Sequence, residues 1–323
     1  MADHHDHGHD HHHDHDHEHG HHHGLGGHHH APADFGWAFA IGVGLNAAYV
    51  LAEAFWGFSV HSVALLADAG HNLGDVIGLA GALLALWLGR RGPSGRYTYG
   101  LRRSSILAAL ANAVILLVVT GGIAWEAIQR LISPEPTGGF VILVVAIAGI
   151  LVNGIAAGLF LSGRKGDLNV KAAFMHMAAD ASLAFGVAVA GAIIMATGWL
   201  RVDPAVSLLI SLVIVIGTWS LLRDSVNLSL DAVPTSIDPD EVGSCLRAQP
   251  GVSEVHDLHI WAMSTTETAL TVHIVREDAA ADGGLLDRIT REVRGRFGIG
   301  HATVQFETAD TAHRCELRPD QVI

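Results

Sequence analysis

The chain has 323 residues, of which 50% are hydrophobic and only 16% are charged, and its mean hydropathy is +0.36. This composition is too apolar for a water-soluble protein of this length and predicts a protein that lies in a lipid bilayer. The formal net charge of -13 comes largely from acidic residues near the start of the chain and after Asp231, and no basic tract suits a nucleic acid.

Residues 1–33 are rich in His, Asp and Gly and contain few apolar side chains. Sixteen of the 24 histidines lie between His4 and His30. A segment of this composition cannot bury a core, so we expect a disordered tail. Imidazole is a common zinc ligand, which favours a metal-collecting tail; a solvated tail without a role, or a purification tag, are the alternatives. The N-terminus lacks a basic segment followed by an apolar one, so no cleaved signal peptide is expected.

Six apolar segments follow between residues 34 and 231, each of about twenty residues or more and so long enough to cross a bilayer. They cover residues 35–55, 62–88, 104–131, 140–161, 169–197 and 204–222. Frequent glycine and alanine would let such helices approach closely. The sequence therefore predicts an α-helical membrane domain with six transmembrane helices.

Basic residues mark one set of the connecting loops. They are Arg90, Arg91, Arg96, Arg102, Arg103, Arg164, Lys165, Lys171 and Arg223. Because positively charged loops stay on the cytosolic side, this pattern places both termini in the cytosol, which an even number of spans permits.

Two of the predicted spans carry a histidine and an aspartate four residues apart. The second span has His71 and Asp75, and the fifth has His176 and Asp180. Residues at this spacing share one face of a helix, so two such helices can present two imidazoles and two carboxylates to one point. That set suits a tetrahedral Zn²⁺ ion, whose charge the two carboxylates balance. Counted from the predicted ends of the spans, both pairs lie roughly 10 to 20 Å deep, which is near the middle of the bilayer.

Other polar residues also lie in the spans. They are Asn46, Glu53, Asp68, Asn112 and Asn153. Glu53 and Asp68 are suited to lining an aqueous path or passing protons, but hydrogen bonds between helices explain each of them equally well.

The composition becomes that of a soluble domain over residues 232–310, and a short tail covers residues 311–323. A helix is expected to start at Asp238, strands at residues 252–263 and 268–275, a second helix at residues 285–297 and a third strand at residues 302–306. The order helix, strand, strand, helix, strand (αββαβ) predicts a small two-layer α+β domain.

This domain has metal-ligating residues of its own, although a histidine near a strand is more often an ordinary surface residue. They are His256, His259, His273, His301, Glu307, His313 and Cys315. The cysteines, Cys245 and Cys315, fall in the part placed in the cytosol and are expected to be thiols.

Several motifs in order resemble the cation diffusion facilitator family of zinc transporters, in its bacterial cadmium/zinc-efflux branch. The matching motifs are Leu65–Asp75, Tyr97–Gly100 with a following arginine, the pair His176 and Asp180, Asp203–Pro204, and Val255–Trp261, within a match from Phe35 to Glu307. The resemblance implies a homodimeric transporter in the inner membrane, not an enzyme, which exports Zn²⁺, with Cd²⁺ and Co²⁺ as further candidates, in exchange for protons. It also implies a ferredoxin-like cytosolic domain at the dimer interface.

The resemblance implies that His71, Asp75, His176 and Asp180 form the transport site. It further implies that the cytosolic domain binds zinc through His256, His273, His301 and Glu307. The family's C-terminal cysteine pattern is only partly present, because Cys315 stands alone with His313 nearby. In the loop after the second span, Tyr97 and Leu101 stand where some members have ligands, so no site is expected there.

Zinc requires neutral imidazole and ionised carboxylate, so metal and protons compete for the same ligands, and we expect alternating access around the site in the bilayer. An ATP-driven pump is disfavoured because the sequence has no phosphate-binding Gly-x-x-x-x-Gly-Lys-Ser/Thr loop and no room for a nucleotide-binding domain. A membrane-anchored metal sensor or storage protein is the main alternative. A metal importer would share the ligands, and the direction of transport is carried by the resemblance alone.

Overall fold

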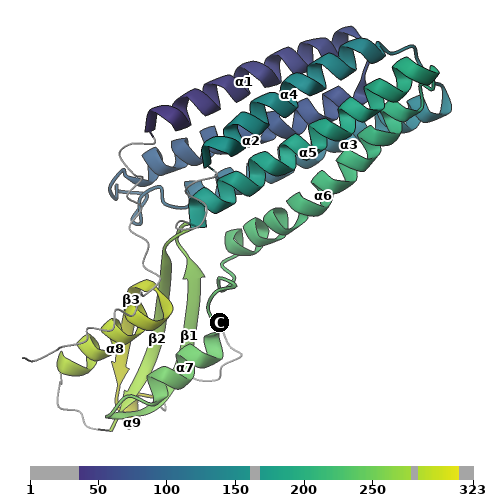
Figure 1. The fold of residues 1–323 in the computed structure, drawn as a ribbon. Helices are drawn as coiled ribbons and strands as arrows, with labels where there is room; N and C mark the ends of the chain where they lie inside the picture. The colour runs from purple at the N-terminus through teal and green to yellow at the C-terminus, as the bar shows by residue number, and fades with distance from the viewer. Residues whose placement is uncertain (1–35, 161–167, 278–282, 313–323) are drawn as a thin grey trace, which may run out of the picture.

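The computed structural model describes residues 36–160, 168–277 and 283–312, which form a long bundle of helices and a smaller part with a sheet at one end of it (Figure 1). The predicted tail at residues 1–33 lies outside the described residues, as do His313 and Cys315.

The bundle is built from the long apolar segments. Its helices are α1 (Gly36–Ser59), α2 (Val63–Gly89), α3 (Ser104–Ile132), α4 (Gly139–Phe160), α5 (Leu168–Thr197) and α6 (Val202–Ser229). Within the described part of the chain, five of them, α2 to α6, are long and apolar enough to cross a membrane. The first predicted span, residues 35–55, corresponds to α1, whose side chains are described from Gly44 onward, and its crossing of the membrane stays a prediction.

Helix α6 is longer than the apolar segment that predicted it. That segment ends at residue 222, whereas the helix continues to Ser229 through Arg223 and Asp224. A hydropathy pattern ends where the lipid ends, but the backbone hydrogen bonds of a helix can continue into water.

The bundle has a small apolar core and an apolar outer surface. Leu65, Ile142 and Val187 are buried between the helices, while Leu83 and Trp125 are exposed. Large apolar side chains on the outside suit a protein whose solvent is lipid.

A buried carboxylate joins α6 to the start of α2. Asp203 accepts hydrogen bonds from the Ser62 hydroxyl and from the Val63 backbone N–H. Ser62 is the N-cap of α2 and its hydroxyl accepts a bond from the Leu65 N–H. Asp203 therefore has donors for both of its oxygens although it is fully buried.

Helices α4 and α5 lie in backbone contact at one point. A Cβ atom at Gly191 would stand 2.7 Å from the Leu143 nitrogen and 3.0 Å from the Gly139 carbonyl oxygen. These glycines are therefore needed for the close approach of the two helices.

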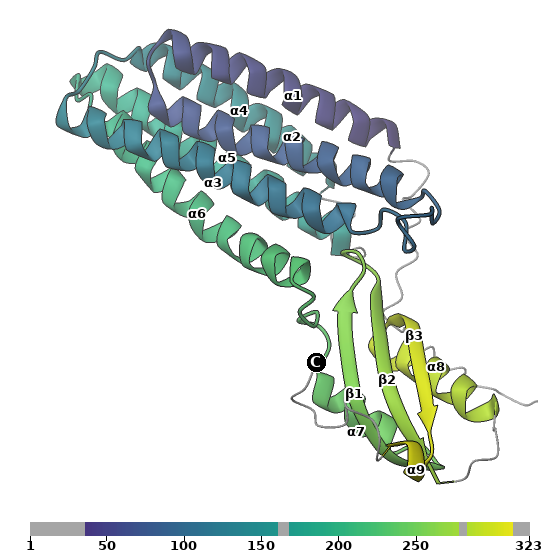
Figure 2. The ribbon, with the colours of Figure 1, turned by 180° about the vertical axis from the view of Figure 1, so that it is seen from behind.

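The smaller part follows the predicted order αββαβ, with one further short helix (Figure 2). Its elements are α7 (Pro239–Arg247), β1 (Val252–Ala262), β2 (Thr268–Arg276), α8 (Gly283–Phe297), β3 (Ile299–Glu307) and α9 (Ala309–Ala312). The sheet has the order β1-β2-β3, with β1 antiparallel and β3 parallel to β2. Side chains of α7 and α8 pack with Leu270, Val272 and Ile274 in one core, so both helices cover the same face of the sheet.

Cys245 in α7 is a free and buried thiol. Its sulfur lies 3.9 Å from a carboxylate oxygen of Glu292. Burial, and then the Glu292 carboxylate, raise the pKa of this thiol above its usual value, so it stays protonated at neutral pH.

The turn between β1 and β2 contacts the loop between α2 and α3. The Arg102 guanidinium lies 2.6 Å from the Glu267 carboxylate, and the Thr265 backbone N–H donates to the Ser105 hydroxyl at 3.1 Å. Arg103 also pairs with Asp231, which follows α6. These contacts join the sheet to the end of the bundle.

The glycine contact predicts opposite effects for two substitutions on α5. Gly191→Ala should lower the stability by on the order of 1–3 kcal/mol, because the methyl group would enter backbone atoms of α4. Gly186→Ala is the matched control, since a Cβ there meets nothing within 4 Å and alanine favours a helix by about 0.5–1 kcal/mol. Thermal unfolding of the detergent-solubilised variants measures both effects, and equal melting temperatures would contradict the close approach.

Candidate metal sites

The two predicted His/Asp pairs face each other in the bundle. His71 and Asp75 lie on α2, and His176 and Asp180 lie on α5, each pair one helical turn apart. The two helices run beside each other within the bundle (Figure 1). The two pairs are about one hundred residues apart in the sequence, and the structure brings their four side chains together.

Each imidazole lies close to both carboxylates. His71 Nε2 is 3.5 Å from Asp180 Oδ1 and 3.9 Å from Asp75 Oδ2. His176 Nε2 is 3.3 Å from Asp75 Oδ2 and 3.6 Å from Asp180 Oδ2. The ring centroids of the two histidines are 6.4 Å apart. The four groups therefore form a closed ring in which nitrogen and oxygen alternate.

This geometry is close to that of a tetrahedral zinc site. Zinc bonds of 2.0–2.1 Å place neighbouring ligand atoms about 3.3 Å apart, and the four nitrogen–oxygen distances in the ring are near this value or somewhat longer. Ligand atoms of His71, Asp75 and Asp180 all lie within 4.8 Å of one another, while His176 contacts this group only through the two carboxylates.

The ring has carboxylate oxygens without donors. Asp180 is buried and neither of its oxygens has a hydrogen-bond partner, and Asp75 Oδ2 and His71 Nδ1 also lack one. Carboxylate oxygens without hydrogen-bond donors are costly inside a bundle, and a bound cation would remove that cost. His176 is 43% exposed, so one side of the ring is accessible.

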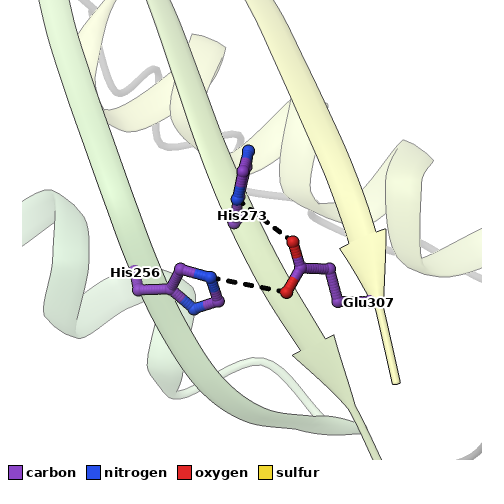
Figure 3. Close-up of side chains that lie close together, drawn as sticks. All are labelled: His256, His273 and Glu307. Atoms are coloured by element: carbon purple, nitrogen blue, oxygen red, sulfur yellow. Dashed lines mark ion pairs between the residues drawn. The ribbon is translucent and has the colours of Figure 1, made fainter. Parts of the chain in front are cut away.

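A second group lies on the face of the sheet that α7 and α8 leave uncovered. His256 on β1 is the register partner of His273 on β2, and Glu307 ends β3 two rows further on, beside Val275. These positions alternate with the core residues of their strands, so the side chains point away from the two helices. Figure 3 shows the three side chains pointing toward one another across the three strands.

The Glu307 carboxylate joins the two histidines. Its Oε1 lies 3.1 Å from His273 Nδ1, and its Oε2 lies 3.4 Å from His256 Nε2. The imidazole centroids are 5.3 Å apart. His256 and Glu307 are buried, and the three ligand atoms lie within 4.8 Å of one another, which is compact enough for one metal ion.

The structure does not bring every predicted ligand to this group. His301 pairs in register with Ala269, four rows from His273, and its ring contacts Tyr99 at a centroid distance of 5.6 Å. Four rows of a strand span roughly 13 Å, too far for a shared ion within one chain. Motif matching placed His301 with the others because it cannot measure distance along a strand.

Asp257 contacts the group and was not predicted. Its carboxylate lies 3.4 Å from His273 Nε2 and 2.8 Å from His259 Nε2. The residue has a left-handed backbone (φ 51°) where the register of β1 shifts between His256 and His259. An irregularity of this kind re-aims a side chain, and alternation along a strand could not have shown it. The aspartate between two histidines was the available signal.

The described residues thus include five apolar helices able to cross a membrane and two groups of His, Asp and Glu side chains that could hold a metal ion. It is thus a multi-pass membrane protein with candidate metal sites both inside and outside the bundle.

Comparison with known proteins gives the family. The family model of the cation efflux transmembrane domain matches residues 39–228, and that of the cation efflux protein cytoplasmic domain matches residues 234–309. The chain belongs to the cation efflux family, which confirms the resemblance seen in its motifs.

Relatives are similar over most of their length. Zinc transporter ZitB of Escherichia coli is 40% identical over 82% of this chain and 85% of the relative. Metal cation efflux system protein CzcD of Cupriavidus metallidurans is 38% identical over 88% and 90%. The cadmium, cobalt and zinc/H(+)-K(+) antiporter of Bacillus velezensis is 33% identical over 88% and 93%.

We expect the sheet group to bind zinc independently of His301. In a chain without residues 1–30, so that the terminal histidines do not contribute, His256→Ala should weaken zinc binding at this group by roughly 100-fold or more. His301→Ala should leave the affinity within about threefold, because its ring lies against Tyr99. Calorimetric titration of both variants measures this, and equal losses would place His301 in the site.

Proposed function

We propose that this protein is a secondary active transporter that exports Zn²⁺ from the cytosol in exchange for protons, with Cd²⁺ and Co²⁺ as further candidate substrates. The observation that carries the proposal is the ring of His71, Asp75, His176 and Asp180, made from two helices inside the bundle. The names of the relatives, which are zinc, cadmium and cobalt transporters, support the choice of metal.

Proton exchange follows from the chemistry of the ligands. Zinc binds neutral imidazole and ionised carboxylate, so each ion that enters must displace the protons these groups hold. Histidine changes its charge near neutral pH, which lets His71 and His176 take protons when zinc leaves. The ring lies between two helices, so a relative movement of α2 and α5 could present it to one side of the membrane and then to the other.

The remaining architecture belongs to the same proposal. Helix α1 crosses the membrane as well, which makes six spans. Residues 34–231 form the membrane domain, and residues 232–310 form a ferredoxin-like cytosolic domain. The arginines between α2 and α3 lie on the cytosolic side, which puts both termini in the cytosol of a protein in the inner membrane. We infer a homodimer joined through the cytosolic domain, consistent with the family to which that domain belongs.

A metal sensor or storage protein is the alternative. The His256, His273 and Glu307 group could serve it, but such a protein would need no ligands inside the bundle. Zinc flux through the membrane distinguishes the two functions.

The geometry of the ring predicts that transport requires the His71 imidazole. His71→Asn should reduce zinc uptake into inverted vesicles by at least about 100-fold, because the ring loses a ligand and leaves Asp180 with one partner fewer. His61→Asn is the matched control: His61 is an exposed histidine just before α2 with a left-handed backbone (φ 53°), which asparagine tolerates. Full transport by the His71 variant would remove this residue from the site.

Antiport predicts that the proton gradient drives the flux. Inverted vesicles with an acidic lumen should accumulate zinc, because protons leave the lumen as the metal enters. A protonophore should abolish the accumulation, and reversal of the gradient should drive zinc out. Radioactive zinc uptake measures all three conditions, and a flux indifferent to the gradient would exclude proton exchange.

A further inference from the structure

Helices α1 and α2 enclose a second polar group close to the ring. Glu53 lies on α1, and Asp68 and Asn72 lie on α2. Glu53 and Asn72 are fully buried and Asp68 is 1% exposed. Asp68 comes three residues before His71, which is roughly 4.5 Å along the helix axis.

The group is short of hydrogen-bond donors. The Tyr49 hydroxyl donates to Glu53 Oε1 at 2.7 Å. Glu53 Oε2, both oxygens of Asp68 and both amide atoms of Asn72 have no hydrogen-bond partner. The carboxyl groups of Glu53 and Asp68 nevertheless lie close enough to interact with each other, and Asn72 lies close to Glu53. Within the described part of the chain, neither carboxyl forms an ion pair with Lys or Arg.

Two ionised carboxylates cannot satisfy each other. Each is only an acceptor, and two like charges in a buried contact repel strongly. One shared proton resolves both problems, because it turns one oxygen into a donor and leaves a single negative charge on the pair. Asp203 shows the contrast, since it is equally buried in α6 but has donors for both oxygens.

We propose that Glu53 and Asp68 form a proton-carrying carboxyl pair, which holds a shared proton while the metal ring is empty and releases it when Zn²⁺ binds. This inference rests on the proposed antiport function and identifies residues that carry a proton outside the metal ligands. The charged and titratable groups that face the pair are Tyr49 from α1, His71 from α2 and Asp180 from α5.

The proton on the pair is accounted for at each step. While the ring is empty, burial and the repulsion between two neighbouring carboxylates favour a protonated pair. The double positive charge of bound zinc favours loss of that proton, so one O–H bond breaks and the proton passes to water on the side to which the site is open. When zinc leaves, the pair takes up a proton from the opposite side. The pair has then carried one proton across the membrane per metal ion, in addition to the protons that the ring ligands exchange.

The carboxyl pair can be tested with the full chain in proteoliposomes. The measured quantity is the zinc concentration ratio across the membrane that a fixed proton gradient maintains. With the membrane potential held at zero and a pH difference of one unit, each exchanged proton contributes about tenfold to the final zinc ratio. Glu53→Gln and Asp68→Asn should each lower that ratio about tenfold from wild type. Asp203→Asn is the matched control and should keep the wild-type ratio.

Zinc ratios in both pair variants equal to that of wild type would overturn the proposal. If wild type itself sustains no zinc gradient, the antiport function has failed instead, so the two failures are distinguishable. A variant that folds but does not transport is tested in detergent by the protons released when zinc is added in weak buffer. About one proton fewer per zinc, with zinc still bound, supports the pair; an equal release, or loss of zinc binding, overturns it.

Discussion

The structure depends on one constraint, which is that an ionised group inside a membrane needs a compensating partner. In the bundle this constraint is met in three ways. Asp203 is compensated by donors from the start of α2. Asp75 and Asp180 contact two imidazoles and leave oxygens that a cation would complete. Glu53 and Asp68 lie beside each other, and of their four oxygens only Glu53 Oε1 accepts a hydrogen bond, from the Tyr49 hydroxyl; a shared proton would compensate the pair.

Helical periodicity and hydropathy were enough to predict most of the helical bundle from the sequence. The ends of α2 to α5 fall within a residue or two of the apolar segments, and the pairing of His71 and Asp75 with His176 and Asp180 follows from a spacing of four on two long helices. The end of α6 was predicted seven residues too early, because hydropathy reports the lipid boundary and the helix continues beyond it.

Predictions for the sheet were less complete, because strands place ligands by register. His256 and His273 are neighbours across β1 and β2, and Glu307 joins them from β3. His301 shares their face but lies several rows away, where it contacts Tyr99. The contribution of Asp257 depends on an irregular backbone that no periodic pattern contains. Distances along and across strands had to come from the structure.

The contact between Gly139 and Gly191 limits how the bundle can deform. Because the backbones of α4 and α5 touch there, neither helix can slide or roll on the other without a steric clash or an empty space. His176 and Asp180 are on α5, so any displacement that separates them from α2 must carry α4 along as a rigid partner. The moving unit is thus a pair of helices, and its hinges belong at the ends of that pair.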